Sequence, residues 1–269
     1  MRKVIDSNYL RSERLRDYLE HSRNNYAVIS DYAAMEAYKD NPIDSIQRSM
    51  KVLCDYPQQV IVLKSTTAIC GLRGRPAGLQ RRLIDTDQTR GFGGYCRTLE
   101  LARTGNMAVR NAIAEHGEVA SAHLALMLRD ADGLPSVFGD IAETYDESEI
   151  RLIRKHEPFT DSIAEKMLAS IFMIAGQFFR DHPKVNKIPS SEELHNTFIF
   201  RFSLCTYLMV LDWITVGGTP NIRSDKVRND LVDLNFAALA TYFDGILTAD
   251  KKLSAVYEEA CIVLEILFE

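Results

Sequence analysis

An alternation of short apolar runs with amphipathic stretches, found at both ends of the chain, constrains the fold more than any other feature. The apolar runs cover 3–6, 26–30 and 59–63 near the N-terminus and 245–247 near the C-terminus. Stretches with helical spacing lie between the first three runs and after the last one. Strands that alternate with helices form parallel sheets with helices on both faces. We therefore expect an α/β fold with a central parallel sheet.

The middle of the chain departs from this alternation. Residues 71–110 hold eight arginines against three acids, a local charge of +5, and seven of their positions are glycine. This composition predicts a basic, loop-rich connection. We therefore divide the chain into a discontinuous α/β core, 1–70 and 221–269, and a basic loop and helical insertion, 71–220. Within the insertion, periodicity predicts helices at 106–130, 136–156, 160–181 and 190–216, with a Gly-Gly-Thr-Pro breaker at 217–220.

Composition excludes several classes of protein. The chain has 269 residues, of which 46% are hydrophobic, so it can bury a sizeable core and is not a disordered protein. A net charge of −5 argues against a protein that coats nucleic acid by bulk charge. Five cysteines without a Cys-x-x-Cys pair argue against a zinc knuckle or a disulfide framework. We expect a cytoplasmic protein, because the first residues also lack the apolar stretch of a signal peptide.

Two strongly apolar windows, 163–179 and 197–216, are long enough to raise the question of a membrane. Each window carries two charged residues, which are costly in the hydrocarbon region of a bilayer. We therefore expect two buried helices and no association with a membrane.

Acidic residues follow the apolar runs at both ends of the chain. Asp6 closes the first run, Asp250 lies just past the last one, and Glu36 sits one turn into the helix after the second. Asp230 and Asp233 are three residues apart, so they share a face of the helix that leads into the last run. In an open parallel sheet, ligands bind outside the carboxyl ends of the strands. We therefore expect these acids at one edge of the sheet.

Such a cluster points to metal chemistry. Carboxylates gathered at one edge repel one another unless cations or protons neutralise them. Oxygen ligands without histidine or cysteine suit hard ions such as Mg²⁺ or Mn²⁺. In phosphodiester hydrolysis, ions of this kind activate water and stabilise the leaving oxygen. The sequence therefore predicts a metal-dependent hydrolase of phosphodiesters.

Three segments resemble the PIN-domain nucleases. They are VIDSN at 4–8, VISDYAAMEAYK at 28–39 and NDLVDLNFAALATYFDGILTADKKL at 229–253. The resemblance implies a three-layer α/β/α core, to which the long middle segment is added as an insertion. It also implies catalytic and metal-binding roles for Asp6, Glu36, Asp233 and Asp250, with Asp230 as an alternative or additional third acid. Ser7 and Thr248 would support these acids.

The resemblance further implies an endoribonuclease that uses Mg²⁺ or Mn²⁺ and acts as a toxin or defence effector. RNA is then the substrate, a homo-oligomer is a further expectation, and a regulatory protein could cover the apolar helices of the insertion. Two alternatives stay open: a nuclease for DNA or structured nucleic acid, and a scaffold that keeps the fold without catalysis. The basic stretch is either a rim that contacts phosphates or a solvated loop. The candidate contacts are Arg73, Arg75, Arg81, Arg82 and Arg90, with Phe92 and Tyr95 as candidates for base stacking.

Overall fold

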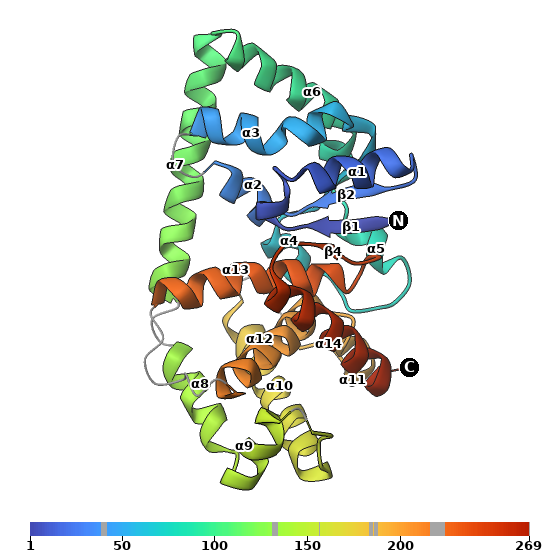
Figure 1. The fold of residues 1–269 in the computed structure, drawn as a ribbon, viewed down its shortest axis with the longest axis vertical. Coiled ribbons are helices and arrows are strands. Elements are labelled where there is room, and N and C mark those ends of the chain that lie inside the picture. Colours follow the sequence, from blue (N-terminus) through green and yellow to red (C-terminus); the bar gives the residue numbers. More distant parts are fainter. Residues whose placement is uncertain are drawn as a thin grey trace.

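A four-stranded parallel sheet lies at the centre of the molecule (Figure 1). The structure is a computed structural model that describes residues 1–38, 42–130, 134–155, 157–182, 185, 188–215 and 224–268. The strands are β1 (Arg2–Ile5), β2 (Tyr26–Ile29), β3 (Val60–Val62) and β4 (Ile246–Leu247), in the order β3-β2-β1-β4. The predicted α/β class and parallel sheet are confirmed. The predicted breaker at 217–220 lies outside the described residues.

Helices follow each of the first three strands. They are α1 (Glu13–His21), α2 (Asp31–Ala37), α3 (Pro42–Asp55) and α4 (Thr66–Cys70). Ser30 and Asp31, two neighbours at the start of α2, have different roles. Ser30 caps the helix, because its Oγ accepts the Ala33 N–H at 3.2 Å. The Asp31 carboxylate instead accepts the backbone N–H and the hydroxyl of Thr66, each at 2.7 Å, and so ties the loop after β3 to the start of α2.

The arginine-rich stretch is mostly helical, which corrects the prediction of a loop-rich connection. It contains α5 (Leu79–Leu83) and the long α6 (Thr86–Arg103). Asp85 caps α6 by accepting the N–H groups of Asp87 and Gln88. The helix packs against β3 and α3 and buries Phe92 and Leu99. Capping and burial together outweigh the low helix propensity of its glycines.

A disulfide between Cys54 of α3 and Cys96 of α6 joins these two helices, with the Cα atoms 5.4 Å apart. The cysteine spacing had argued against disulfides, because 42 residues separate this pair in the sequence. Their proximity depends on the packing of α6 across α3, which no local pattern reveals.

Helices make up the middle of the chain. They are α7 (Met107–Asp130), α8 (Leu134–Glu143), α9 (Glu147–Arg154), α10 (Asp161–Asp181), α11 (Ser191–Leu194) and α12 (Phe198–Thr215). The single helix predicted at 136–156 is two helices, α8 and α9. Asp146 starts the second of them, because it forms a reciprocal capping box with Glu149.

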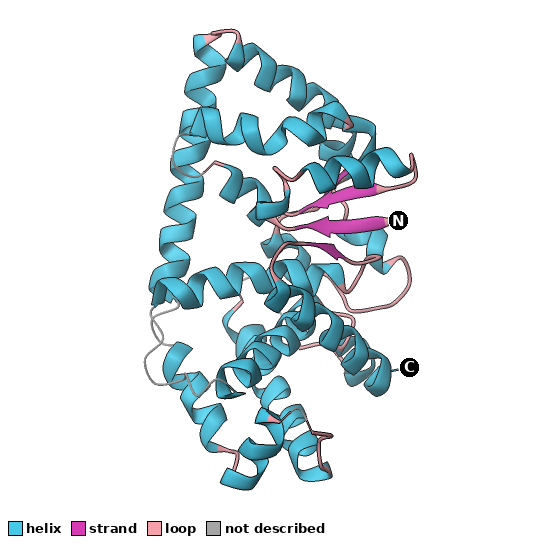
Figure 2. Ribbon diagram, in the orientation of Figure 1, coloured by secondary structure: helices cyan, strands magenta, loops and turns pink. Residues whose placement is uncertain are grey.

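The C-terminal part consists of α13 (Ser224–Ala240), β4 and α14 (Lys251–Phe268). Helix α13 packs against β1 and β4 and, elsewhere along its surface, against α12. Figure 2 shows the strands confined to the centre, with helices around them. Buried side chains from the predicted core and from the predicted insertion belong to one continuous hydrophobic cluster. The division of the chain at residues 71 and 220 stays a prediction.

Two helices, α10 and α12, are long and apolar enough to cross a membrane by length and composition. In α12, 83% of the apolar window is buried inside the fold, so its apolarity is that of a core helix. In α10 the buried share is 39%.

Gly74 provides a test of the contact between the arginine-rich stretch and α11. A Cβ atom at Gly74 would lie 1.9 Å from the carbonyl oxygen of Glu193. We therefore expect Gly74→Ala to lower the free energy of unfolding by about 1–3 kcal/mol through overpacking. At Gly91 of α6 a Cβ meets nothing within 4 Å. Gly91→Ala should raise the same quantity by about 0.5–1 kcal/mol. Urea unfolding measures both, and equal effects would contradict the described contact.

Candidate functional site

Asp6 lies at the carboxyl edge of the sheet, as the sequence predicted. Strands β1 and β4 pair with Val4 beside Ile246, and the Asp6 N–H donates to the carbonyl oxygen of Leu247 at 3.0 Å. The next side chain after β4, Thr248, therefore reaches the acid, and its hydroxyl donates to Asp6 Oδ2 at 2.7 Å. Asp6 is only 1% exposed. Its burial raises the carboxyl pKa, and the bond from Thr248 opposes this rise.

Glu36 is brought to the same place by α2. The hydroxyl of Ser7 donates to Glu36 Oε2 and also lies 3.4 Å from Asp6 Oδ1. A hydroxyl has one proton to donate, and the contact with Glu36 is the shorter of the two. Ser7 and Thr248 therefore each hold one of the predicted acids, which is the placement expected for supporting residues.

Asp233 of α13 is the acid most affected by the negative charges around it. Burial raises the pKa of its carboxyl, and the charges of Asp6, Glu36, Asp250 and Asp230 raise it further, to about 8. The other four predicted acids therefore all lie close enough to Asp233 to act on its charge. Since they come from four elements far apart in the sequence, this convergence is the main finding on the site.

Asp230 has a different environment from Asp233. Its pKa is also raised by burial, but Lys252 and Lys226 oppose the rise. Lys252 Nζ lies 3.8 Å from Asp230 Oδ2 and 3.0 Å from Asp212 Oδ2. Asp230 Oδ2 is nevertheless buried, and it accepts no hydrogen bond from any residue that the structure describes.

Asp250 is exposed and caps α14. Its Oδ1 accepts the N–H groups of Lys252 at 2.7 Å and of Leu253 at 3.2 Å, and its own N–H donates to the hydroxyl of Thr248. It therefore combines the two roles that the sequence left open, a helix cap and an acid at the sheet edge.

Two polar cavities flank the acids. One has a volume of about 20 Å³ and is lined by Asp230, Asp233, Asp250 and Lys252 together with four apolar residues. This is room for about one water molecule or small ion. The other, of about 200 Å³, lies beside Ser7 and Glu36. The size of the first cavity, its three acids and the Asp230 Oδ2 without a hydrogen bond from a described residue suit a hard cation, which would share the site with the ammonium of Lys252.

The candidate acids lie farther apart than the ligands of a formed metal centre. Over the described part of the chain, no three His, Cys, Asp or Glu side chains converge closely enough to hold a metal ion together. Mg²⁺ usually keeps several waters and binds through only one or two carboxylates. The arrangement therefore fits a partly hydrated ion rather than a closed protein cage.

Four of the five candidate arginines belong to a segment that packs at the other end of the sheet. Gln80 of α5 accepts from Arg2, at the start of β1, and donates to the carbonyl oxygen of Tyr242, at the end of α13. Next to it on α5, Arg82 donates to the carbonyl oxygens of Arg73 and Arg75.

These contacts do not form the predicted basic rim beside the acids. The side chain of Arg82 instead stabilises its own loop. Arg81 is exposed on α5, and Arg90 is exposed on α6 next to Thr89, which bonds Val62 of β3. Phe92, expected to stack on bases, is buried in the core, where its ring centre lies 5.7 Å from that of Tyr95.

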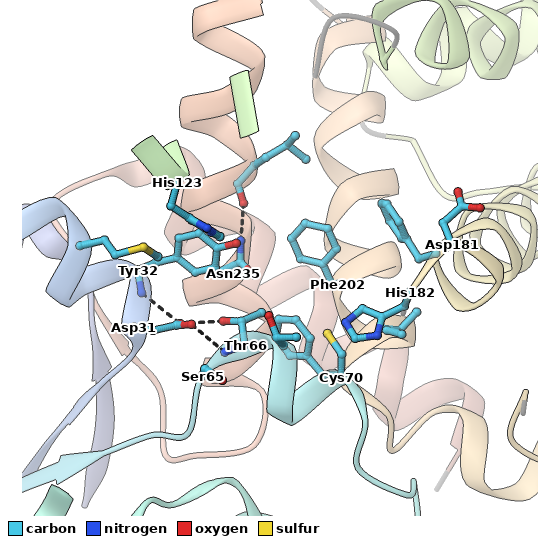
Figure 3. A pocket seen from close by; sticks show the side chains of 16 residues that line it. Asp31, Tyr32, Ser65, Thr66, Cys70, His123, Asp181, His182, Phe202 and Asn235 are labelled. Atoms are coloured by element: carbon cyan, nitrogen blue, oxygen red, sulfur yellow. Dashed lines mark hydrogen bonds between the residues drawn. The ribbon is translucent and has the colours of Figure 1, made fainter. Parts of the chain in front are cut away.

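A larger cavity, of about 570 Å³, lies along the same edge of the sheet, beyond β2 and β3 (Figure 3). Figure 3 shows Tyr32 and His123 on one side of it and Phe202 and His182 on the other. Asn235 of α13 also lines it, so α13 borders both this cavity and the acids. No local pattern predicts this cavity, because its walls come from six helices and the loops beside them.

The chain matches no protein-family model, no curated protein and no solved structure. The resemblance to PIN-domain nucleases therefore depends on the short motifs and on the placement of their acids.

The raised pKa of Asp233 predicts how stability depends on pH. In the unfolded chain the carboxyl loses its proton near 3.8, and in the folded protein near 8. Between these values the folded state holds more protons, so stability falls as pH rises, by up to about 1.4 kcal/mol per pH unit. Asp233→Asn removes this loss. In urea unfolding in EDTA, the free energy of unfolding of the variant relative to that of the wild type should increase from about pH 5 to 8. An equal gain in the control variant Asp244→Asn would contradict this assignment.

Proposed function

We propose that this protein is a metal-dependent nuclease, most simply an endoribonuclease of the PIN-like kind. The observation that carries the proposal is the position of Asp233, half-buried, whose pKa is raised to about 8 by burial and by the charges of four other carboxylates. A protein gains nothing in stability from five acids at one edge, so the cluster points to a function that uses cations.

The side chains divide the work as follows. Asp233, Asp230 and Asp250 line the small cavity that would hold Mg²⁺ or Mn²⁺, with Asp6 and Glu36 next to it. An ion bound there supplies an activated water and stabilises the leaving oxygen. Thr248 and Ser7 keep Asp6 and Glu36 oriented through the hydrogen bonds that they donate.

Several finer points belong to the same proposal. We infer a three-layer PIN-like core, RNA as substrate and a role as a toxin or defence effector from the resemblance of the motifs. A cytoplasmic location stays an expectation from the N-terminal sequence, while the Cys54–Cys96 disulfide does not support the argument from the cysteines. The hypothesis of a regulatory partner finds support on α10, where Phe172 and Met173 are 46% and 51% exposed. Helix α12, the other apolar helix that motivated it, is buried in the core. A homo-oligomer is a further expectation from the resemblance.

A second candidate function is a binding module that keeps the fold without catalysis. Two observations favour it: Asp250 serves as a helix cap, and within the described residues no three acids lie at ligand distance. The proposed nuclease differs from this module in one measurable property, which is metal-dependent cleavage.

Cleavage of labelled single-stranded RNA tests the nuclease. We expect activity with Mg²⁺ or Mn²⁺ and none in EDTA, and a loss of more than about 100-fold in Asp6→Asn, since losing even an outer partner of a catalytic metal costs 10–100-fold. Asp244→Asn is the matched control. Asp244 is an acid at the opposite end of β4, where it accepts the Arg2 N–H at 2.6 Å. Full activity in folded Asp6→Asn would refute the proposal, and cleavage of DNA instead of RNA would correct the substrate.

Metal binding can also be measured without cleavage. An ion that binds only the folded state at about 100 times its dissociation constant adds about 2.7 kcal/mol, or roughly 5–10 °C in Tm for a chain of this size. We expect Mn²⁺ to raise the Tm of the wild type in this way and to leave Asp233→Asn nearly unchanged. A wild type that does not respond to Mn²⁺ would favour the binding module.

A further inference from the structure

A second polar cavity lies beside Glu36 and is not part of the carboxylate cluster. Its volume is about 200 Å³, and Ser7, Asn8 and Arg11 line it from the segment that follows β1. Ser45 and Ser49 of α3 line the opposite wall. This cavity contains an arginine, which none of the sequence motifs indicated.

Two buried hydroxyl groups hold the Arg11 side chain in place. Arg11 Nε donates to Ser49 Oγ at 3.0 Å, and one Nη donates to Ser45 Oγ at 2.9 Å. Each serine is only 2% exposed, one helical turn from the other on a face of α3 that otherwise buries apolar side chains. Burying a hydroxyl is costly unless it is hydrogen-bonded. The two serines therefore hold the guanidinium in a fixed position.

Among the described residues Arg11 has no ion-pair partner, although the acid Glu36 lines the same cavity. Within the same part of the chain, its other Nη makes no hydrogen bond. Arg11 is exposed toward solvent, while the two serines fix its other edge. An immobilised guanidinium with free donors is suited to phosphate, which it can bind through two parallel hydrogen bonds.

We propose that this cavity binds a backbone phosphate of the substrate strand, next to the phosphate that is cleaved. The inference rests on the proposed function, since Glu36 belongs both to this cavity and to the carboxylate cluster. It names the substrate class: a polynucleotide with at least two phosphates rather than a small phosphodiester. Arg11 binds the neighbouring phosphate, and the hydroxyls of Ser45 and Ser49 are positioning groups.

Binding of a fluorescein-labelled single-stranded RNA, followed by anisotropy in EDTA between about 50 and 200 mM KCl, tests the subsite. Arg11→Ala should weaken binding about 10-fold or more, because a charged hydrogen-bond partner is lost. The slope of log K against log[KCl] should shrink by about 0.7, the contribution of one phosphate contact on a single strand. Arg23→Ala is the matched control, since Arg23 is exposed in the turn before β2, at the other end of the sheet.

Two further variants separate binding from folding. Arg11→Lys keeps the positive charge but not the paired N–H donors of the guanidinium. It should therefore retain most of the salt slope and lose part of the affinity for RNA. The double variant Ser45→Ala/Ser49→Ala keeps the arginine but removes the two hydroxyls that hold it. It should weaken RNA binding by a smaller factor than Arg11→Ala does. The Tm of each variant shows whether the fold is intact.

The outcomes distinguish this inference from the proposed function. Equal affinity and equal salt slope for Arg11→Ala and Arg23→Ala would overturn the subsite and leave Arg11 a solvated side chain, even if the wild type cleaves RNA. Binding that depends on Arg11, in a wild type that cleaves nothing with Mg²⁺ or Mn²⁺, would support the subsite and overturn the nuclease. A wild type that does not bind RNA would overturn the subsite.

Discussion

The pairing of β1 with β4 is the interaction on which the candidate site depends. Strand β4 has only two residues, Ile246 and Leu247, and it joins the C-terminal part of the chain to the N-terminal strand. The register places Thr248 at Asp6, and the helix that leads into β4 lies against β1 as a consequence. Acids separated by more than two hundred residues in sequence therefore meet at one edge. A shift of this short strand would move Asp250 and the acids of α13 away from Asp6 and Glu36.

The helices of the middle segment supply the stability that such a site requires. Like charges brought together at a partly buried edge cost free energy, and two residues of strand pairing cannot offset that cost. Helix α12 packs against α13 and α14, the two helices that flank β4, and it buries side chains on nearly all of its faces. Each large apolar side chain buried there contributes about 1.5–3 kcal/mol. The middle segment therefore supports the C-terminal part of the sheet, whether or not it also recognises a substrate.

Local patterns predicted the strands and the acids at their ends, because an apolar run followed by an acid can be recognised in the sequence without knowledge of the tertiary structure. The same patterns missed what long-range contacts decide. Gln80 carries the basic segment to the far end of the sheet through contacts with Arg2 and Tyr242. Helix α6 forms despite its glycines because it packs on α3 and β3. A signal for Arg11 was present, since two serines one turn apart interrupt the apolar face of α3, but their partner is on another element.

The sequence could not choose between Asp230 and Asp233 as the third acid, but their surroundings differ in one decisive respect. Asp230 shares Lys252 with Asp212, and Lys226 adds a second positive charge, so its charge is partly compensated within the protein. The largest influences on the pKa of Asp233 are burial and four carboxylates, all of which raise it. A proton or a metal ion must compensate Asp233 at neutral pH, and the two compete for the same oxygens. Asp233 is therefore the acid whose state an added cation changes most, and Asp230 the one that assists it.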